Sequence, residues 1–188
     1  MDKLSIINNA LLKVALPPAA ALDDCDWNAG RVFESSAEEC LRAHGWSFAM
    51  RYATLEQLES PPFGFKYAYQ MPEDCVRVVD IRPGSDLRSP RARFVTRGRQ
   101  VFTNANPANT RYTGRELDTE IWPGDFANAV SCRIAAEIAG LSAEKIAMIP
   151  QLMQLAQIAL NQAIMTDARE ETERVPLDDS LYASRGER

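Results

Sequence analysis

The stretch that most limits the fold lies at residues 20–52, where a helical pattern changes abruptly into an alternating one. Between about 26 and 44, apolar side chains recur every three or four positions, which is the spacing of one buried helix face. Gly45 follows, and glycine can end a helix in the left-handed conformation at little steric cost. Alternate positions from Trp46 to Tyr52 are then apolar, as in a strand. A helix that leads directly into a strand predicts a core of mixed α and β structure.

The rest of the chain extends this pattern. Further helices are predicted at about 3–15, 123–140 and 143–171, where apolar residues again recur at helical spacing. Between them, about 46–122 has the alternation and turn residues of a β-rich insert, with Gly98 at the turn of a hairpin over 91–103. We therefore expect an α+β fold, mainly α. A helical bundle from both chain ends would carry a small antiparallel β element inserted between them.

Composition limits the class of protein. The 188 residues suffice for one sizeable domain, predicted as a single unit over 1–172 with an extended C-terminal tail at 173–188. No apolar run approaches the ~20 residues that span a bilayer, and the N-terminus lacks the pattern of an export signal, so we expect no membrane partner. The cysteines show no metal-binding spacing. Cys40 and Cys132 fall on apolar helix faces and are predicted to be buried thiols, as in a protein that folds in a reducing cytoplasm.

Charge is distributed unevenly along the chain. The net charge is −5, yet residues 77–116 carry nine arginines, no lysine and only three acidic residues. Arginine favours planar, bidentate contacts with carboxylates or phosphates. This segment is either a solvated loop region or a docking surface for acidic partners or nucleic acid. Because the whole chain is acidic and no aromatic residues alternate with the arginines, protein docking is favoured over nucleic-acid binding. The candidate docking residues are Arg88, Arg91, Arg93, Arg97 and Arg99.

Catalytic patterns are weak. His44, the only histidine, precedes Gly45 at a predicted helix end, where capping or packing explains it better than catalysis. No G-x-S-x-G turn or glycine-rich phosphate loop is present, and neighbouring acidic residues are usually solvated. We expect no enzyme activity, no metal and no cofactor. The tail beyond residue 172 is too polar to fold alone, but it carries spaced apolar residues that could order on a partner. These residues are Val175, Leu177, Leu181 and Tyr182.

Several segments taken in order resemble one known family. They are IINNALL at 6–12, CLRAHGWSFA at 40–49, FGFKYAYQMPEDCVRV at 63–78, RYT at 111–113 and FANA at 126–129. Their order and spacing resemble the tail tubular protein A family, the head-to-tail adaptors of short-tailed bacteriophages. The resemblance covers most of residues 4–170.

The resemblance implies a structural virion protein. Members form a dodecameric ring beneath the portal of the phage head, extend the DNA channel and present a surface to the tail nozzle or other tail proteins. By this resemblance the tail residues Val175, Leu177, Leu181 and Tyr182 would reach the portal, and the five candidate arginines would face the tail side. Genomic DNA would pass without sequence-specific binding. The protein would be found in the virion neck, and in the host cytoplasm during assembly.

Two other functions remain open on the sequence. The arginine-rich middle would also suit a small nucleic-acid-binding protein. A cell-wall hydrolase with an unidentified carboxylate pair is the third possibility, although no particular pair stands out.

Overall fold

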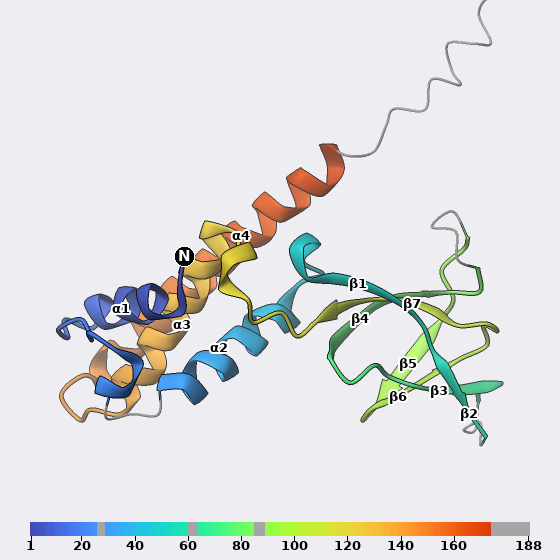
Figure 1. Ribbon diagram of the computed structural model, residues 1–188, viewed down its shortest axis with the longest axis horizontal. Coiled ribbons are helices and arrows are strands. Elements are labelled where there is room, and N and C mark those ends of the chain that lie inside the picture. The colour runs from blue at the N-terminus through green and yellow to red at the C-terminus, as the bar shows by residue number, and fades with distance from the viewer. Residues whose placement is uncertain (26–28, 60–63, 85–88, 174–188) are drawn as a thin grey trace, which may run out of the picture.

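The computed structural model describes residues 1–25, 29–59, 64–84 and 89–173. Helices come first and last in the described chain, and strands lie between them (Figure 1). The α-helices are α1 (Lys3–Lys13), α2 (Ala29–Ala43), α3 (Gly124–Gly140) and α4 (Ile149–Glu173). The strands are β1 (Met50–Thr54), β2 (Glu56–Leu58), β3 (Tyr67–Gln70), β4 (Cys75–Arg82), β5 (Phe94–Arg97), β6 (Gln100–Thr103) and β7 (Asn109–Gly114). Short 3₁₀ helices are η1 (Leu22–Asp24), η2 (Ser47–Ala49), η3 (Thr119–Ile121) and η4 (Ile146–Met148).

The helical part is organised around α3. Helices α1, α2 and α4 each pack against it, and their apolar faces meet in one buried cluster. Phe126 and Ile134 of α3 are fully buried in this cluster, together with Phe33 of α2. Trp46 enters the same cluster from the connection that follows α2, where its ring lies edge-on against Phe126. Burial of these large side chains is the main stabilising contribution to this half of the molecule.

The β part consists of two small antiparallel sheets. One has the strand order β1-β7-β4 and the other β2-β3-β6-β5. A second apolar cluster, separate from that of the helices, is formed by side chains from both sheets. Tyr69, Ile81 and Val101 are its largest fully buried members. The two sheets lie at the opposite end of the long axis from α1 (Figure 1).

The two parts meet at the C-terminal end of α2. Arg77 of β4 donates to the carbonyl oxygen of Ala43 at 2.8 Å, and the Thr113 hydroxyl of β7 donates to that of His44 at 3.3 Å. These bonds satisfy carbonyls that a helix end leaves without intrahelical partners. The chain enters the β part at Met50 of β1 and leaves it at the end of β7. These two points are adjacent, because Met50 is paired with Thr113. Polar contacts of the backbone therefore hold the strands on the helices.

Several predictions are confirmed. The fold is mixed α+β, with helices at both ends of the described chain and antiparallel strands between them. The predicted hairpin is formed by β5 and β6, and Gly98 in its turn has a positive φ of 59°. Cys40 and Cys132 are buried. Pro150 lies in the first turn of α4, where its missing N–H costs no helical hydrogen bond.

The prediction that a strand begins at Trp46 was wrong. Residues 47–49 form the 3₁₀ helix η2, and β1 begins only at Met50. The reason is that the Trp46 indole turns back and donates to the carbonyl of Cys40 at 2.9 Å, which folds the chain onto the end of α2. Gly45 does not adopt the predicted left-handed conformation either. A Cβ atom at this position would lie 3.2 Å from Val79, so close packing between α2 and β4 explains the glycine.

Two other boundaries were also wrong. The β-rich insert was predicted to reach residue 122, but the last strand ends at Gly114 and 119–121 form η3, where Asp118 accepts the N–H of Glu120. The last helix does not begin at 143, since residues 143–145 form turns and α4 starts at Ile149 after η4. The predicted start of the second helix at 26 falls outside the described residues. The tail from 174 onward also lies outside them, so its separation from the 1–172 unit stays a prediction.

Candidate docking surfaces

The outer side of α4 is the most unusual surface of the described chain. From Ile149 to Thr166, about five turns, the helix contains no charged residue. One side packs on α3 through small side chains, as Ala156 and Ala159 contact Ala129 and Cys132. The other side exposes large apolar side chains: Leu155 at 42%, Ile158 at 56% and Met165 at 57% of their surface. A helix facing water normally carries charged residues there, so this composition is typical of a surface that another molecule covers.

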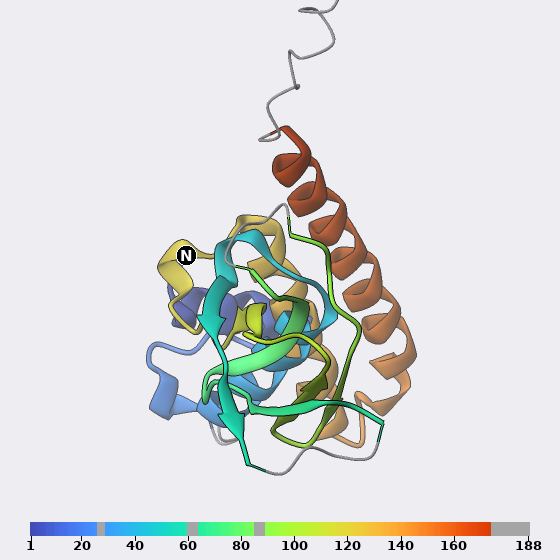
Figure 2. The ribbon, with the colours of Figure 1, turned by 90° about the vertical axis from the view of Figure 1, so that its right-hand side faces the viewer.

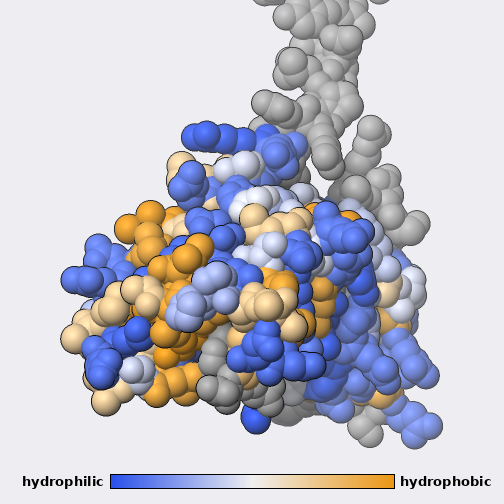
Figure 3. All heavy atoms as spheres, turned by 60° about the vertical axis from the view of Figure 1, so that its left-hand side comes forward, coloured by the Kyte–Doolittle hydropathy of each residue, from blue (hydrophilic) through white to orange (hydrophobic). Residues whose placement is uncertain are grey.

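Figure 3 shows the other surfaces of the helical part, with the α1 end turned toward the viewer. Apolar side chains, coloured orange, gather on the helices in this view, whereas the side toward the strands is mostly hydrophilic. Large exposed apolar residues at this end are Leu12 of α1, Leu141 after α3 and Ile146 of η4. The helical part therefore exposes apolar side chains at more than one place.

The candidate arginines divide into two groups. Arg93 directly precedes β5, Arg97 ends it and Arg99 lies in the turn to β6, and all three are exposed. None of the three forms an ion pair with another described residue, although Arg97 lies over the Phe102 ring and Arg99 donates to the Pro72 carbonyl. These three form the outer arginine row of the hairpin. Arg91 differs because its Nε lies 3.6 Å from Asp80.

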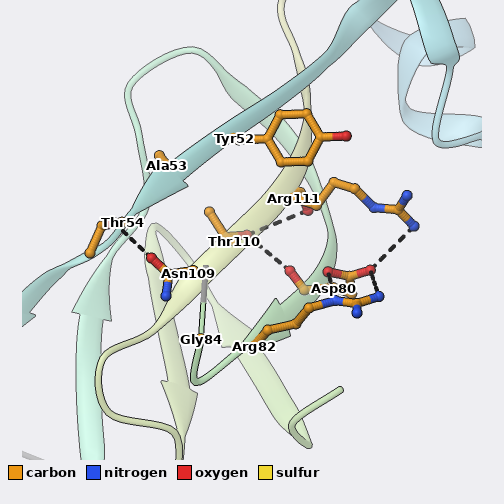
Figure 4. Close-up of a pocket in the computed structure, with 9 residues that line it drawn as sticks. All are labelled: Tyr52, Ala53, Thr54, Asp80, Arg82, Gly84, Asn109, Thr110 and Arg111. Carbon is orange, nitrogen blue, oxygen red and sulfur yellow. Dashed lines mark hydrogen bonds and ion pairs between the residues drawn. The ribbon is translucent and has the colours of Figure 1, made fainter. Parts of the chain in front are cut away.

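The inner group surrounds Asp80, a carboxylate that is almost completely buried. Its oxygens lie 3.4 Å from Arg82 Nε and 3.2 Å from an Arg111 guanidinium nitrogen, and the Thr110 hydroxyl donates to its carbonyl oxygen (Figure 4). Burying a carboxylate is costly unless cations and donors compensate it, which is what these arginines do. Three of the nine arginines, Arg82, Arg91 and Arg111, thus pair with a buried carboxylate of the fold.

A pocket of about 250 Å³ opens beside this group, between β1, β7 and the end of β4 (Figure 4). Its hydroxyls are already engaged: Thr54 donates to the Asn109 side chain at 2.7 Å, and Thr110 to the Asp80 carbonyl at 3.2 Å. The carboxylate among the lining residues, Asp80, is paired with Arg82 and Arg111. In the described structure these groups therefore hold one another in place.

One cluster contains the residue types of a catalytic triad but not its geometry. The Ser47 hydroxyl donates to Asp167 at 2.6 Å, and His44 Nε2 lies 3.2 Å from the other oxygen of the same carboxylate. In a triad the histidine must lie between serine and carboxylate to accept the serine proton. Here the carboxylate lies between the other two, and it also accepts the backbone N–H of Ser47 at 3.1 Å. The cluster therefore fastens α4 to the end of α2.

The motifs behind the family resemblance have similar scaffold roles. Asp74 of the MPEDC segment accepts from the Tyr112 hydroxyl at 3.1 Å and from Arg51 of β1. Arg51 also donates to Glu116 at 2.9 Å, and these two carboxylates raise its pKa. Asp74 thus joins the MPEDC turn to two strands that are distant in the sequence.

Several predicted site residues cannot be placed. Arg88 and the tail residues Val175, Leu177, Leu181 and Tyr182 all lie outside the described residues. No group of three or more metal-binding side chains occurs in the described part of the chain. Of the helices described, none combines the length and hydropathy needed to cross a bilayer.

Two features of the site were not predicted from the sequence. The absence of charged residues along 149–166 can be read directly from the sequence, but it was not used. The buried partner of the inner arginines, Asp80, has no comparable signal, because it is one acidic residue in a β-branched strand.

Comparison with models of protein families and with curated proteins finds no match to this chain.

Proposed function

We propose that the protein is a structural adaptor that assembles into a ring between the portal of a phage head and the tail. The observation that carries this proposal is the uncharged outer face of α4, where Leu155, Ile158 and Met165 are exposed among amide side chains. Leaving Leu155, Ile158 and Met165 in water forgoes the free energy of burying them, about 1.5–3 kcal/mol for each fully buried side chain. A protein whose function is to assemble gains that free energy at its interfaces.

An adaptor also needs different surfaces for different partners. The outer arginine row lies on the β part, and the uncharged face lies on the helical part, so the two are carried by different halves of the molecule. In this proposal the helical bundle, built from both chain ends, forms the ring. The inserted β element contacts the tail side through Arg93, Arg97 and Arg99. Residues beyond 172 are proposed to reach the portal. The resemblance to the tail tubular protein A family supports each of these roles.

The proposed function is non-enzymatic, with no cofactor. The cluster of Ser47, His44 and Asp167 favours a non-enzymatic function, because its side chains are arranged to hold α2 and α4 together. The ring would surround the DNA channel and make no sequence-specific contact with the genome. The protein would be located in the virion neck, after assembly in the host cytoplasm.

The central test is assembly on the portal. Purified protein is mixed with portal rings, and mass and shape are followed by light scattering and electron microscopy. The expected result is a ring of about twelve copies on one end of the portal, since heterologous contacts of this kind close by rotation. A protein that stays monomeric and instead binds duplex DNA with steep salt dependence would contradict the proposal and favour the nucleic-acid function. Cleavage of cell-wall substrate, abolished by one carboxylate substitution, would favour the hydrolase.

Matched variants make this test specific. Ile158→Glu places a charge on the outer face of α4, whereas Gln57→Glu places one on an exposed position of β2. Both changes affect exposed side chains and should alter the free energy of unfolding by no more than about 0.5 kcal/mol. We expect Ile158→Glu to abolish ring formation and Gln57→Glu to leave it intact.

The role of the tail is tested by truncation after Thr172. We expect the shortened protein to remain folded, because the packed residues of α4 end at Asp167. Portal docking should weaken at least tenfold, since the spaced apolar residues of 173–188 are removed. Docking of unchanged affinity would refute the tail's role and leave the ring proposal standing.

A further inference from the structure

A second uncharged surface lies in the α1–η1 connection, which we define as residues 14–21. This segment, VALPPAAA, contains no charged residue, and Pro17, Pro18 and Ala20 are exposed. Beside it is an open hollow of about 340 Å³, lined almost entirely by apolar residues. The lining residues are Leu11, Leu16, Pro17, Pro18, Ala19, Ala20, Asp24 and Cys25. Asp24, the one charged member, accepts the Ala21 N–H at 2.7 Å.

The connection is held in a fixed shape before any partner arrives. The side-chain amide of Asn8 donates to the Ala19 carbonyl at 3.1 Å and accepts the Ala19 N–H at 2.8 Å. The Leu16 N–H donates to the Leu11 carbonyl at 2.9 Å, which closes the end of α1. A surface fixed in this way loses little conformational entropy on binding, which favours association.

The two uncharged surfaces lie on opposite sides of the molecule. In Figure 2, α4 (orange to red) lies along one edge of the molecule, and the chain between α1 and η1 (blue) lies at the other edge. Within one copy they are separated by the helical part and cannot cover each other. A second copy, placed side by side in the same orientation, brings its connection next to the first copy's α4.

We infer that the outer face of α4 packs against the α1–η1 connection of a second copy of this chain. Leu155 and Ile158, one turn apart on α4, would enter the apolar hollow of the neighbour, and Met165 would extend the contact along the helix. Because the two surfaces differ, each copy uses one to receive a neighbour and the other to join the next. Such head-to-tail contacts generate a closed ring or an open filament, not a dimer. The inference rests on the proposed function in that the ring of the adaptor would be built through this contact.

Charge and composition favour a second copy over other occupants. The two surfaces are alike in having few charges and many small or apolar side chains, so their contact requires little desolvation of ions. Asp24 is the one charged residue that lines the hollow, and it already accepts the Ala21 N–H. An acidic or basic partner would find no counter-charge on α4 between 149 and 166.

The inference is tested by placing the photo-cross-linker p-benzoylphenylalanine at position 158 of the full chain. The protein is irradiated at about 1 mM, and linked peptides are identified by mass spectrometry. We expect linked dimers that join position 158 to residues 11–22 of another chain, at least tenfold more abundant than with the probe at exposed Gln57. Links from 158 to α4 of another chain, links only to residues 174–188, or no links at all would each overturn the inference.

A mixing experiment distinguishes head-to-tail from symmetric contact. Ile158→Glu damages only the α4 face, and Ala20→Glu only the connection, so each variant alone should be monomeric. Mixed together, they retain one intact pair of surfaces and should form heterodimers that grow no further. Assembly of the Ala20→Glu variant alone would exclude the connection from the contact.

The same experiments separate this inference from the proposed function. A ring that forms on the portal without links between 158 and the connection would leave the adaptor standing and remove this interface. Links in the free protein without assembly on the portal would leave the interface and remove the adaptor.

Discussion

Trp46 offers the sharpest test of how the helical part is held together. Its side chain is 1% exposed, lies edge-on against Phe126 at 4.8 Å between ring centroids, and donates to the Cys40 carbonyl at 2.9 Å. Trp46→Ala removes the ring and leaves a cavity among rigid neighbours. Truncations of this kind cost about 3–5 kcal/mol. We expect about 4 kcal/mol, a large fraction of the 5–15 kcal/mol that stabilises a typical domain.

Trp46→Phe separates burial from hydrogen bonding. This variant keeps most of the apolar ring but removes the indole N–H that caps the Cys40 carbonyl near the end of α2. Loss of one such bond to a buried acceptor costs about 1–3 kcal/mol. The phenylalanine variant should therefore lie between the wild type and the alanine variant in stability.

Urea denaturation followed by far-UV circular dichroism measures both variants, because this signal does not depend on the tryptophan removed. With a slope of about 2 kcal/mol per molar urea, the alanine variant should unfold at about 2 M lower urea. Tyr52→Ala serves as the control, since Tyr52 is 63% exposed and should change stability by no more than about 0.5 kcal/mol. A loss below about 1 kcal/mol for Trp46→Ala would refute the burial argument. A phenylalanine variant as unstable as the alanine variant would show that the hydrogen bond dominates.

Three further predictions concern the polar groups. Asp80→Ala should destabilise the β part by about 3–5 kcal/mol, because it leaves buried guanidinium groups without their carboxylate. The triple change of Arg93, Arg97 and Arg99 to Gln is the comparison. It should leave the urea midpoint nearly unchanged and weaken only partner binding. Asp167→Ala should lower the free energy of unfolding by about 2–4 kcal/mol, because the Ser47 N–H loses its acceptor. We expect faster amide hydrogen exchange in the C-terminal half of α4. Unaltered exchange would contradict the role of Asp167 in fastening this helix. Burial raises the pKa of the Cys40 thiol to about 12, so that at pH 9 only about 0.1% of it is thiolate. Labelling of Cys40 by iodoacetamide, followed by the mass of its peptide, should therefore stay slow from pH 7 to 9 in the native protein. In urea the same labelling should accelerate as the pH rises.

The sequence allowed the helices and most strands to be predicted because their patterns are local. The hairpin at Gly98 follows from residue chemistry within a few positions, whereas the last helix was predicted to start at 143 and starts at Ile149. Trp46 shows where this reasoning failed, since its alternating neighbours indicated a strand. A hydrogen bond to Cys40, six residues away, folds the segment back instead. The prediction for Gly45 failed for a related reason, because its close neighbour is Val79, on a strand that no local pattern connects to it.

The candidate surfaces were only partly predictable. The sequence showed that the middle is rich in arginine, but only the fold divides the arginines into an inner group around Asp80 and an outer row on the hairpin. Which residues share a face across different strands depends on register, and register is a long-range property. The uncharged stretch of α4 was visible in the sequence. Its exposure was not, because a helix with this composition could equally be buried inside the fold.

The pairing of Met50 with Thr113 has a consequence for how such a molecule can change over evolution. The chain leaves the helical part and returns to it through two neighbouring strands, so the ends of the β part lie about 5 Å apart. A β unit whose two ends are neighbours, and which supplies the contacts that β4 makes with the end of α2, could replace this one. Exchange of this module by recombination would give the protein a new β surface in one step, while the contacts among the helices are inherited unchanged.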